Sequence, residues 1–170
     1  MSAMMTLKTL PEESRIWIEA RSSLHPVRGE ASGLAGEAEV EVRDGRFDLT
    51  TPPRARLELP VERLNSGSEF QDSEMQRRIE ARKYPMIAAE LRGVTPLLEM
   101  DRYRLLTDLT FHGVTRRLEV DVTGRLNKNR VSVEGEFSLD VRAFDVVPPS
   151  ILGIKVHPDI KVRVFMVLAL

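Results

Sequence analysis

The sequence predicts a mainly β protein, a closed antiparallel β-barrel of about eight strands with one helix inserted between strands. Three observations lead to this prediction. Apolar and polar residues alternate along most of the chain, as they do in strands with one dry and one wet face. Short turn sequences join neighbouring segments, and a single helix signal interrupts the alternation. About eight antiparallel strands can close on themselves, which leaves no unpaired edge.

We expect one domain at residues 15–170, preceded by an N-terminal extension at 1–14. A chain of 170 residues with 42% hydrophobic content is long enough for one core and too short for two ordinary domains. Two turn sequences, RDGR at 43–46 and NKN at 127–129, supply the Gly and Asn that accept the positive φ of tight hairpin turns. In chain order, the alternating segments predict strands around 16–21, 37–42, 56–59, a weaker one at 87–91, 103–111, 117–122, 131–140 and 160–168.

One segment breaks the strand pattern. The stretch SEFQ at 68–71 resembles a capping box and predicts a helix of about three turns over 72–83. Met75 and Ile79 lie on one face of this helix. A second, short helical turn is expected at 149–155.

The composition excludes several classes of function. Lys+Arg 25 against Asp+Glu 26 leave a formal net charge of -1, so no general field attracts nucleic acid. The chain has Cys 0, which removes disulfides, thiolate nucleophiles, zinc–thiolate sites and iron–sulfur clusters together. Stability must therefore come from packing.

The N-terminal sequence carries no export signal that we can identify. Lys8 and Pro11 interrupt the apolar residues before a signal-peptide core of roughly 7–15 residues can form. No uncharged apolar run approaches the roughly 18 residues of a transmembrane helix. The sequence predicts a cytoplasmic protein that does not span a membrane.

Three stretches of the chain carry a likeness to a known family. Residues 109–122, LTFHGVTRRLEVDV, contain a strand, a His-Gly-Val-Thr turn and a second strand. Residues 71–94, QDSEMQRRIEARKYPMIAAELRGV, contain a helix and a Tyr-Pro that leads into a strand, and the tail runs from Phe137 through ILGIKVHPDIKVRVFMVL at 151–168. Together these blocks resemble the YceI-like family. The resemblance implies a lipocalin-like barrel with a helical segment across it, whose lumen in characterised members holds the tail of a polyisoprenoid.

The inward-facing residues of the predicted strands are apolar. Phe111 and Phe137 are the large members of this set, and a lumen lined by it would admit an apolar, elongated ligand. The residues expected to line or fill the lumen are Ile16, Ile18, Leu57, Leu59, Leu105, Leu109, Phe111, Val120, Val122, Val133, Phe137, Leu139, Val164 and Met166.

Five residues are candidates for the mouth of the barrel or for a head-group site: Met75, Arg78, Ile79, Tyr84 and His112. An apolar stripe such as Met75 and Ile79 is more often part of a core than of a lid, but in this fold the stripe must face the mouth or the wall. Arg78 belongs to a basic cluster on the helix, and a guanidinium can bind phosphate oxygens in bidentate fashion. The alternative for this cluster is a solvated helix face.

We expect no catalytic residue, metal or cofactor. His25, His112 and His157 lack the i,i+2 or i,i+4 spacing that would place two ligands on one face. A Gly-x-Ser-x-Gly nucleophile elbow is absent, and no Gly-rich phosphate loop opens a helix after a strand.

The first functional hypothesis is a non-enzymatic protein that binds, sequesters or transports an isoprenoid-like lipid, of polyprenyl or quinone type, in its lumen. The alternative is a filled barrel that acts as a structural or protein-interaction module and forms a homodimer. Phe165 and Val167 motivate this alternative because they lie on the parity opposite Val164 and Met166. A strand that is apolar on both faces needs cover from a helix or a partner.

Overall fold

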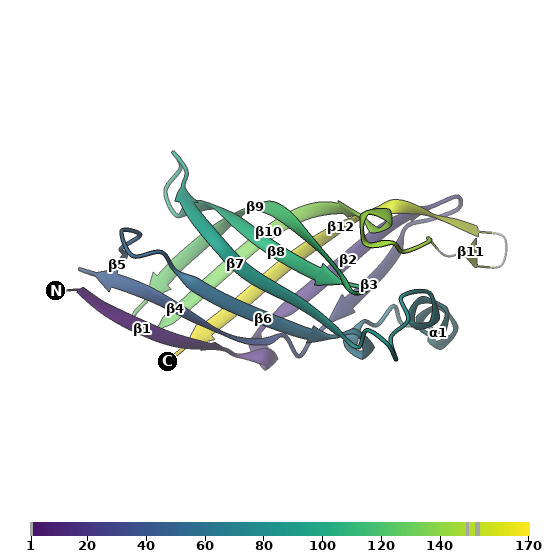
Figure 1. Ribbon diagram of the computed structural model, residues 1–170, viewed down its shortest axis with the longest axis horizontal. Coiled ribbons are helices and arrows are strands. Elements are labelled where there is room, and N and C mark those ends of the chain that lie inside the picture. Colours follow the sequence, from purple (N-terminus) through teal and green to yellow (C-terminus); the bar gives the residue numbers. More distant parts are fainter. Residues whose placement is uncertain (1, 149, 152–153) are drawn as a thin grey trace.

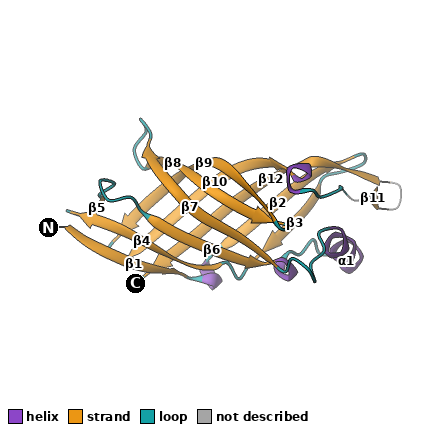
Figure 2. Ribbon diagram, viewed as in Figure 1, coloured by secondary structure: helices purple, strands orange, loops and turns teal. Residues whose placement is uncertain are grey.

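The computed structural model describes residues 2–148, 150–151 and 154–170, and its strands form a closed antiparallel barrel (Figure 1, Figure 2). The last strand of the ring returns to the first, where Leu168 and Ala169 pair with Thr9 and Lys8. The prediction of a mainly β barrel with one inserted helix is therefore confirmed. In ring order, the eight strands of the described chain that close the barrel are β1 (Ser2–Thr9), β4 (Ala35–Arg43), β6 (Arg54–Pro60), β7 (Met86–Pro96), β8 (Arg102–Phe111), β9 (Val114–Asn127), β10 (Arg130–Asp140) and β12 (Ile154–Ala169).

The first strand corrects the expected N-terminal extension. β1 pairs with β4 along nearly its whole length, so residues 2–9 are part of the barrel wall. Leu7 and Thr9 are buried, whereas Thr6 and Lys8 are exposed. This is the same period-two pattern that marks the other strands, but the sequence shows it weakly because the exposed Met4 is apolar and the buried Thr9 is polar.

Two neighbouring positions of the barrel wall are each built from two consecutive strands with a break between them, and the two breaks lie at the same level along the barrel. The short 3₁₀ helix η1 (Pro11–Glu13) follows β1, and β2 (Arg15–Ser22) then continues along the same edge of β12. β3 (Val27–Ala31) pairs with β2, as β4 pairs with β1. Beyond the break, an isolated bridge between Glu30 and Asn65 joins β3 to the segment after β6. The backbone ladder is therefore sparse between β3 and the segment that leads to the helix.

Two predicted hairpin turns are confirmed. Asp44 and Gly45, with φ of 50° and 74°, join β4 to the short strand β5 (Arg46–Phe47). Lys128, with φ of 57°, lies in the turn between β9 and β10. Such turns match the twist of the strands on either side.

The helical turn expected at 149–155 is wrong in the part that the structure describes. Ser150–Ile151 form β11, which pairs with the start of β12, while residues 149, 152 and 153 lie outside the described residues. A 3₁₀ turn does occur earlier, at η3 (Val141–Phe144).

The predicted helix forms directly after the predicted capping residue Ser68, so it begins at Glu69 and not at residue 72, and it also ends early. The helix α1 (Glu69–Arg78) is capped by Ser68, whose hydroxyl accepts a hydrogen bond from the Gln71 N–H at 3.3 Å. Glu80 then adopts φ of 50°, and the N–H of Ala81 donates to the Gln76 carbonyl at 2.9 Å. This is the left-handed helix ending that usually contains glycine. Because Glu80 occupies that position, the sequence lacks the stop signal, and the predicted end at residue 83 is too late.

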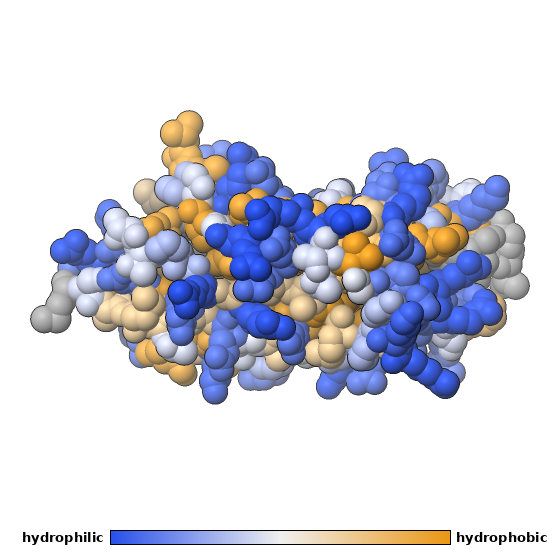
Figure 3. All heavy atoms as spheres, in the orientation of Figure 1, coloured by the Kyte–Doolittle hydropathy of each residue, from blue (hydrophilic) through white to orange (hydrophobic). Residues whose placement is uncertain are grey.

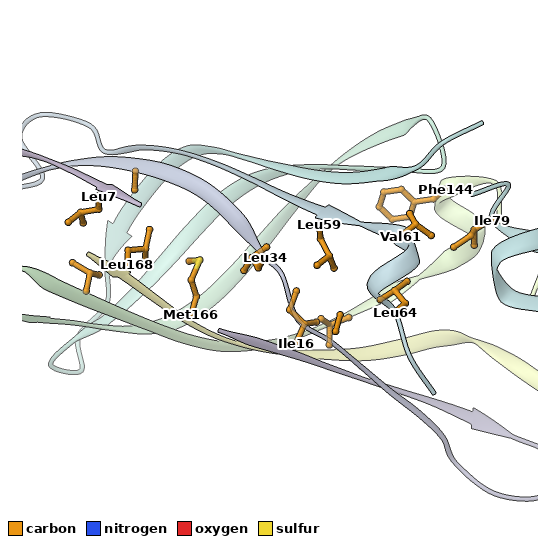
Figure 4. Close-up of a cluster of buried hydrophobic side chains, with 14 of the residues drawn as sticks. Leu7, Ile16, Leu34, Leu59, Val61, Leu64, Ile79, Phe144, Met166 and Leu168 are labelled. Carbon is orange, nitrogen blue, oxygen red and sulfur yellow. The ribbon is translucent and has the colours of Figure 1, made fainter. Parts of the chain in front are cut away.

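The buried side chains extend along the barrel axis (Figure 4). Leu7 and Leu168 lie at one end, Met166 in the middle, and Ile79 and Phe144 at the end near α1. The face seen in Figure 3 is largely hydrophilic over the strands. In the part of the chain that the structure describes, no helix is both long and apolar enough to cross a bilayer.

Ion pairs connect neighbouring strands on the outer face. The Asp108 carboxylate accepts hydrogen bonds from Arg117 Nε at 3.0 Å and from Arg92 Nε at 2.8 Å. These hydrogen bonds hold the pKa of Asp108 below its ordinary value, and the one from Arg117 contributes most. A carboxyl with a depressed folded-state pKa stabilises the fold above its unfolded-state pKa, and this contribution is lost as the pH falls through the folded-state pKa.

Replacing Asp108 by asparagine should therefore lower the thermal midpoint at neutral pH by a small amount and leave it unchanged in strong acid. Thermal unfolding of Asp108→Asn and of the wild type across a pH series from about 7 to about 2 would measure this. The two curves should converge as the pH falls. Curves that stay parallel across the series would contradict the assignment.

Candidate ligand-binding site

The barrel encloses two adjoining apolar cavities. The larger, the outer chamber, has a volume of about 360 Å³ and reaches from the middle of the barrel to the α1 end. The smaller, the inner chamber, has a volume of about 150 Å³ and reaches from the middle toward β5. The outer chamber lies within the range of small-molecule sites, about 300–1,000 Å³. The residues that line both chambers, and so form a waist between them, are Leu57, Ala89, Leu105, Thr107, Val122, Val133 and Met166.

Every residue that the sequence places in the lumen lies on the wall of the outer chamber. These residues come from β2, β6, β8, β9, β10 and β12, and their common parity directs them inward because successive side chains of a strand point to opposite faces. The structure brings all of them together around one space. Contact between them and a ligand stays a prediction.

Several wall residues were not among the expected ones. Ile87 and Ala89 come from the weaker predicted strand, and Val162 shares the parity of Val164 on β12, so the alternation could have identified them. Leu34 lies between β3 and β4, and its side chain reaches the outer chamber from outside any predicted strand. No periodic signal marks a residue of that kind.

Two aromatic rings line the inner chamber. Phe47 and Tyr103 line it and do not line the outer chamber, and their rings meet edge to face at 5.9 Å. Burial raises the pKa of the Tyr103 phenol, with the nearby Asp101 carboxylate as a second cause. The phenol therefore stays uncharged, in keeping with the apolar wall around it.

A polar rim borders the outer chamber between β3 and α1. Asp72 accepts hydrogen bonds from the Ser66 N–H at 2.9 Å and from the Ser66 hydroxyl at 2.7 Å, which ties the start of α1 to the segment before it. Arg28 pairs with Glu19 at 3.5 Å on the outer face of β2 and β3. Apart from Thr107 of the waist, the polar and charged residues that line the outer chamber are Arg28, Glu30, Glu58, Asn65, Ser66, Gln71, Asp72 and His157.

The five mouth candidates divide into two groups. Met75 and Ile79 of α1 line the outer chamber, and Ile79 is 4% exposed. Arg78, Tyr84 and His112 do not line either chamber. Arg78 has a buried Nε without a hydrogen-bond partner within the described residues, and its position gives no support to a head-group role.

Tyr84 and His112 instead join three elements behind the mouth. His112 Nδ1 lies 2.8 Å from the Phe144 carbonyl oxygen, and Nε2 lies 2.6 Å from Glu80 Oε2. The Tyr84 ring packs edge to face on the imidazole at 5.1 Å. The β8–β9 turn thus holds both η3 and the segment after α1, and so fixes the helix against the barrel.

Gly113 makes this arrangement possible, and its replacement provides a test. Gly113 has φ of 72°, and a Cβ there would lie 2.5 Å from Tyr84 Cε1. Gly45 has nearly the same φ, 74°, with nothing within 4 Å of a Cβ. We expect Gly45→Ala to cost about 1–2 kcal/mol for the left-handed backbone alone. Gly113→Ala should cost a further ~1–3 kcal/mol for the clash with Tyr84.

Chemical denaturation of the two variants would measure this difference. Equal destabilisation by Gly45→Ala and Gly113→Ala would show that Tyr84 does not pack closely on the turn.

Metal-ligating side chains do not gather in the described residues. Across 2–148, 150–151 and 154–170, no group of three or more His, Asp or Glu side chains could hold a metal ion. His25 Nδ1 lies 3.0 Å from the Pro26 carbonyl oxygen in the β2–β3 turn, and His157 lies on the rim of the outer chamber.

An antiparallel barrel around an apolar lumen is the architecture of lipocalin-like proteins. The comparison with family models is more specific, because the YceI-like domain matches residues 8–168, nearly the whole chain. The chain therefore belongs to the YceI-like family, which confirms the resemblance seen in three stretches of its sequence. A comparison with curated proteins finds no match.

Solved structures share this fold at low sequence identity. Burkholderia cenocepacia BcnA has a TM-score of 0.78 at 17% identity, covering 94% of this chain and 98% of its own. A polyisoprenoid binding domain from Saccharophagus degradans, implicated in plant cell wall breakdown, has a TM-score of 0.71 at 12% identity, covering 96% and 97%. The Campylobacter jejuni YCEI protein has a TM-score of 0.65 at 13% identity, covering 83% of each chain.

Proposed function

We propose that this protein is a non-enzymatic binding protein that holds an apolar, isoprenoid-like lipid of polyprenyl or quinone type in its lumen. The observation that carries the proposal is the pair of adjoining apolar chambers, which together form a long, narrow space. A flexible hydrocarbon chain matches such a space, and burying it there is favourable by about 0.8 kcal/mol for each CH₂ group. The polyisoprenoid binding domain from Saccharophagus degradans, which has the same fold, supports this class of ligand.

The rim favours a lipid with an uncharged head group. Glu30 and Asp72 place two carboxylates beside the opening, and Arg28 is already paired with Glu19. A diphosphate at this position would face like charges, and Arg28 is the one arginine among the described residues that line the outer chamber. A hydroxyl or quinone oxygen, in contrast, can exchange hydrogen bonds with Asn65, Ser66 or Gln71.

The filled-barrel alternative receives less support. The lumen contains chambers of about 360 and 150 Å³, whereas a filled barrel would have side chains in that space. Val167, which suggested a covering partner, is 7% exposed, because the chain itself covers it. Its N–H donates to the Ser14 hydroxyl at 3.2 Å, and its carbonyl accepts from the Leu10 N–H at 2.8 Å. A homodimer stays a prediction, which light scattering at high protein concentration would test.

Thermal unfolding with added lipids tests the proposal. A ligand at about 100 times its Kd stabilises the folded state by about 2.7 kcal/mol, which for a chain of this size raises the midpoint by roughly 5–10 °C. We expect such a shift with a long polyprenol and a smaller shift with the corresponding diphosphate. A straight-chain fatty alcohol of equal carbon number is the control for chain shape. No shift with any isoprenoid would contradict the proposal.

A further inference from the structure

We infer that the inner chamber receives the terminal isoprene unit of the bound lipid and that its end wall sets the maximum chain length the protein accepts. This inference rests on the proposed function, and it specifies what the inner chamber does within it. It follows from three features: the small volume of the inner chamber, its waist and its aromatic end wall.

The volume of the inner chamber decides what it can hold. At about 150 Å³ it is too small to be a separate site for a drug-sized ligand, which needs about 300–1,000 Å³. An apolar cavity of about this volume can take up a molecule of benzene size. That is close to one isoprene unit, so the inner chamber suits the end of a chain whose remainder lies in the outer chamber.

The waist allows a chain to pass between the chambers. Ala89 on β7 contributes a small side chain to it, and Met166 on β12 contributes an unbranched, flexible one. Methionine adapts readily to the shape of an apolar neighbour. Figure 4 shows Met166 pointing into the lumen between Leu168 and Leu34, at the position where the two chambers meet.

Rigid aromatic groups line the far part of the inner chamber. Phe47 and Tyr103 come from β5 and β8, and their rings cross at 83°. Gly124 on β9 lies beneath them, and a Cβ at that position would be 3.4 Å from Tyr103 Cδ2. The tyrosine ring therefore rests on the β9 backbone, where no side chain separates them. These packed rings form the wall against which the end of a chain would come to rest.

Narrowing the waist should shorten the accepted chain. Ala89→Phe places a ring between the chambers, and Ala88→Phe is the matched control, because Ala88 lies next to it on β7 and lines neither chamber. The binding constants of each variant are measured for a series of all-trans polyprenols that differ by one isoprene unit. We expect Ala89→Phe to weaken binding of the longest accepted polyprenol about tenfold or more and to bind shorter ones as the wild type does. Ala88→Phe should follow the wild type at every length.

Opening the end wall should have the opposite effect and provides a second test if Ala89→Phe does not fold. Tyr103→Leu removes one ring of the aromatic end wall and keeps an apolar side chain. The longest polyprenol accepted by Tyr103→Leu should exceed that of the wild type by at least one unit. If the wild type binds polyprenols up to a certain length and neither variant changes that length, the inference is overturned and the proposed function is not. A wild type that binds no polyprenol of any length would overturn the proposed function as well.

Discussion

Replacing Leu139 by glutamate is expected to abolish lipid binding and to lower the free energy of unfolding by roughly 3–5 kcal/mol. Leu139 lies on β10 and lines the outer chamber, among apolar side chains from the neighbouring strands. A carboxylate there loses its water, and the residue opposite it on β12, Ile160, is apolar and offers it no charge. An apolar chain in the lumen would also have to contact the charge or the water that accompanies it.

The neighbouring residue provides the control for this substitution. Ser138 is exposed on the outer face of the same strand and pairs with Lys161 of β12. Ser138→Glu introduces the same charge in water beside a lysine, so it should leave both stability and binding close to wild type. Chemical denaturation and polyprenol binding would be measured for both variants. Wild-type stability and affinity in Leu139→Glu would show that this position does not face a dry lumen.

Replacing Phe144 by alanine should produce the largest loss of stability from packing alone. Phe144 is 1% exposed, and its ring lies 5.8 Å from the ring of Phe111, next to the outer chamber. Truncating a buried phenylalanine typically costs about 3–5 kcal/mol. For a chain of this size the thermal midpoint should fall by roughly 10 °C.

Val147 supplies the comparison, because it lies three residues further along and is 64% exposed. Val147→Ala should change the thermal midpoint by no more than about 1 °C. A similar, small change in both variants would mean that η3 does not dock against the barrel as the structure describes.

The strand pattern predicts the lumen well because barrel geometry repeats one rule. Along a strand, every second side chain points inward. The alternation around Leu105 and Leu109 therefore shows which residues of β8 line the lumen, without any knowledge of the fold. The rule fails where the backbone changes register. Between Leu91 and Gly93 the pairing of β7 with β8 shifts by one residue, so Val94 faces the inner chamber on the opposite parity. The sequence therefore indicates only the first half of β7.

The mouth is harder to predict because contacts distant in the chain create it. His112 lies in a turn, and only the fold places Glu80 and the Phe144 carbonyl on its two ring nitrogens. Arg78 is the last residue of α1, next to Ile79 in the sequence, but Ile79 reaches the chamber wall and Arg78 does not. The division of the lumen into two chambers depends on how side chains from six strands meet at the waist, which periodicity does not describe.

The most direct test of the central claim is native mass spectrometry of the purified protein, followed by solvent extraction and identification of any small molecule released. A lipid in the lumen should be retained through purification, because a lipid that left the lumen would expose its apolar surface to water. The account predicts one isoprenoid molecule for each chain, with an uncharged head group. A clean mass of the bare chain, together with an unchanged thermal midpoint when long isoprenoids are added, would contradict it.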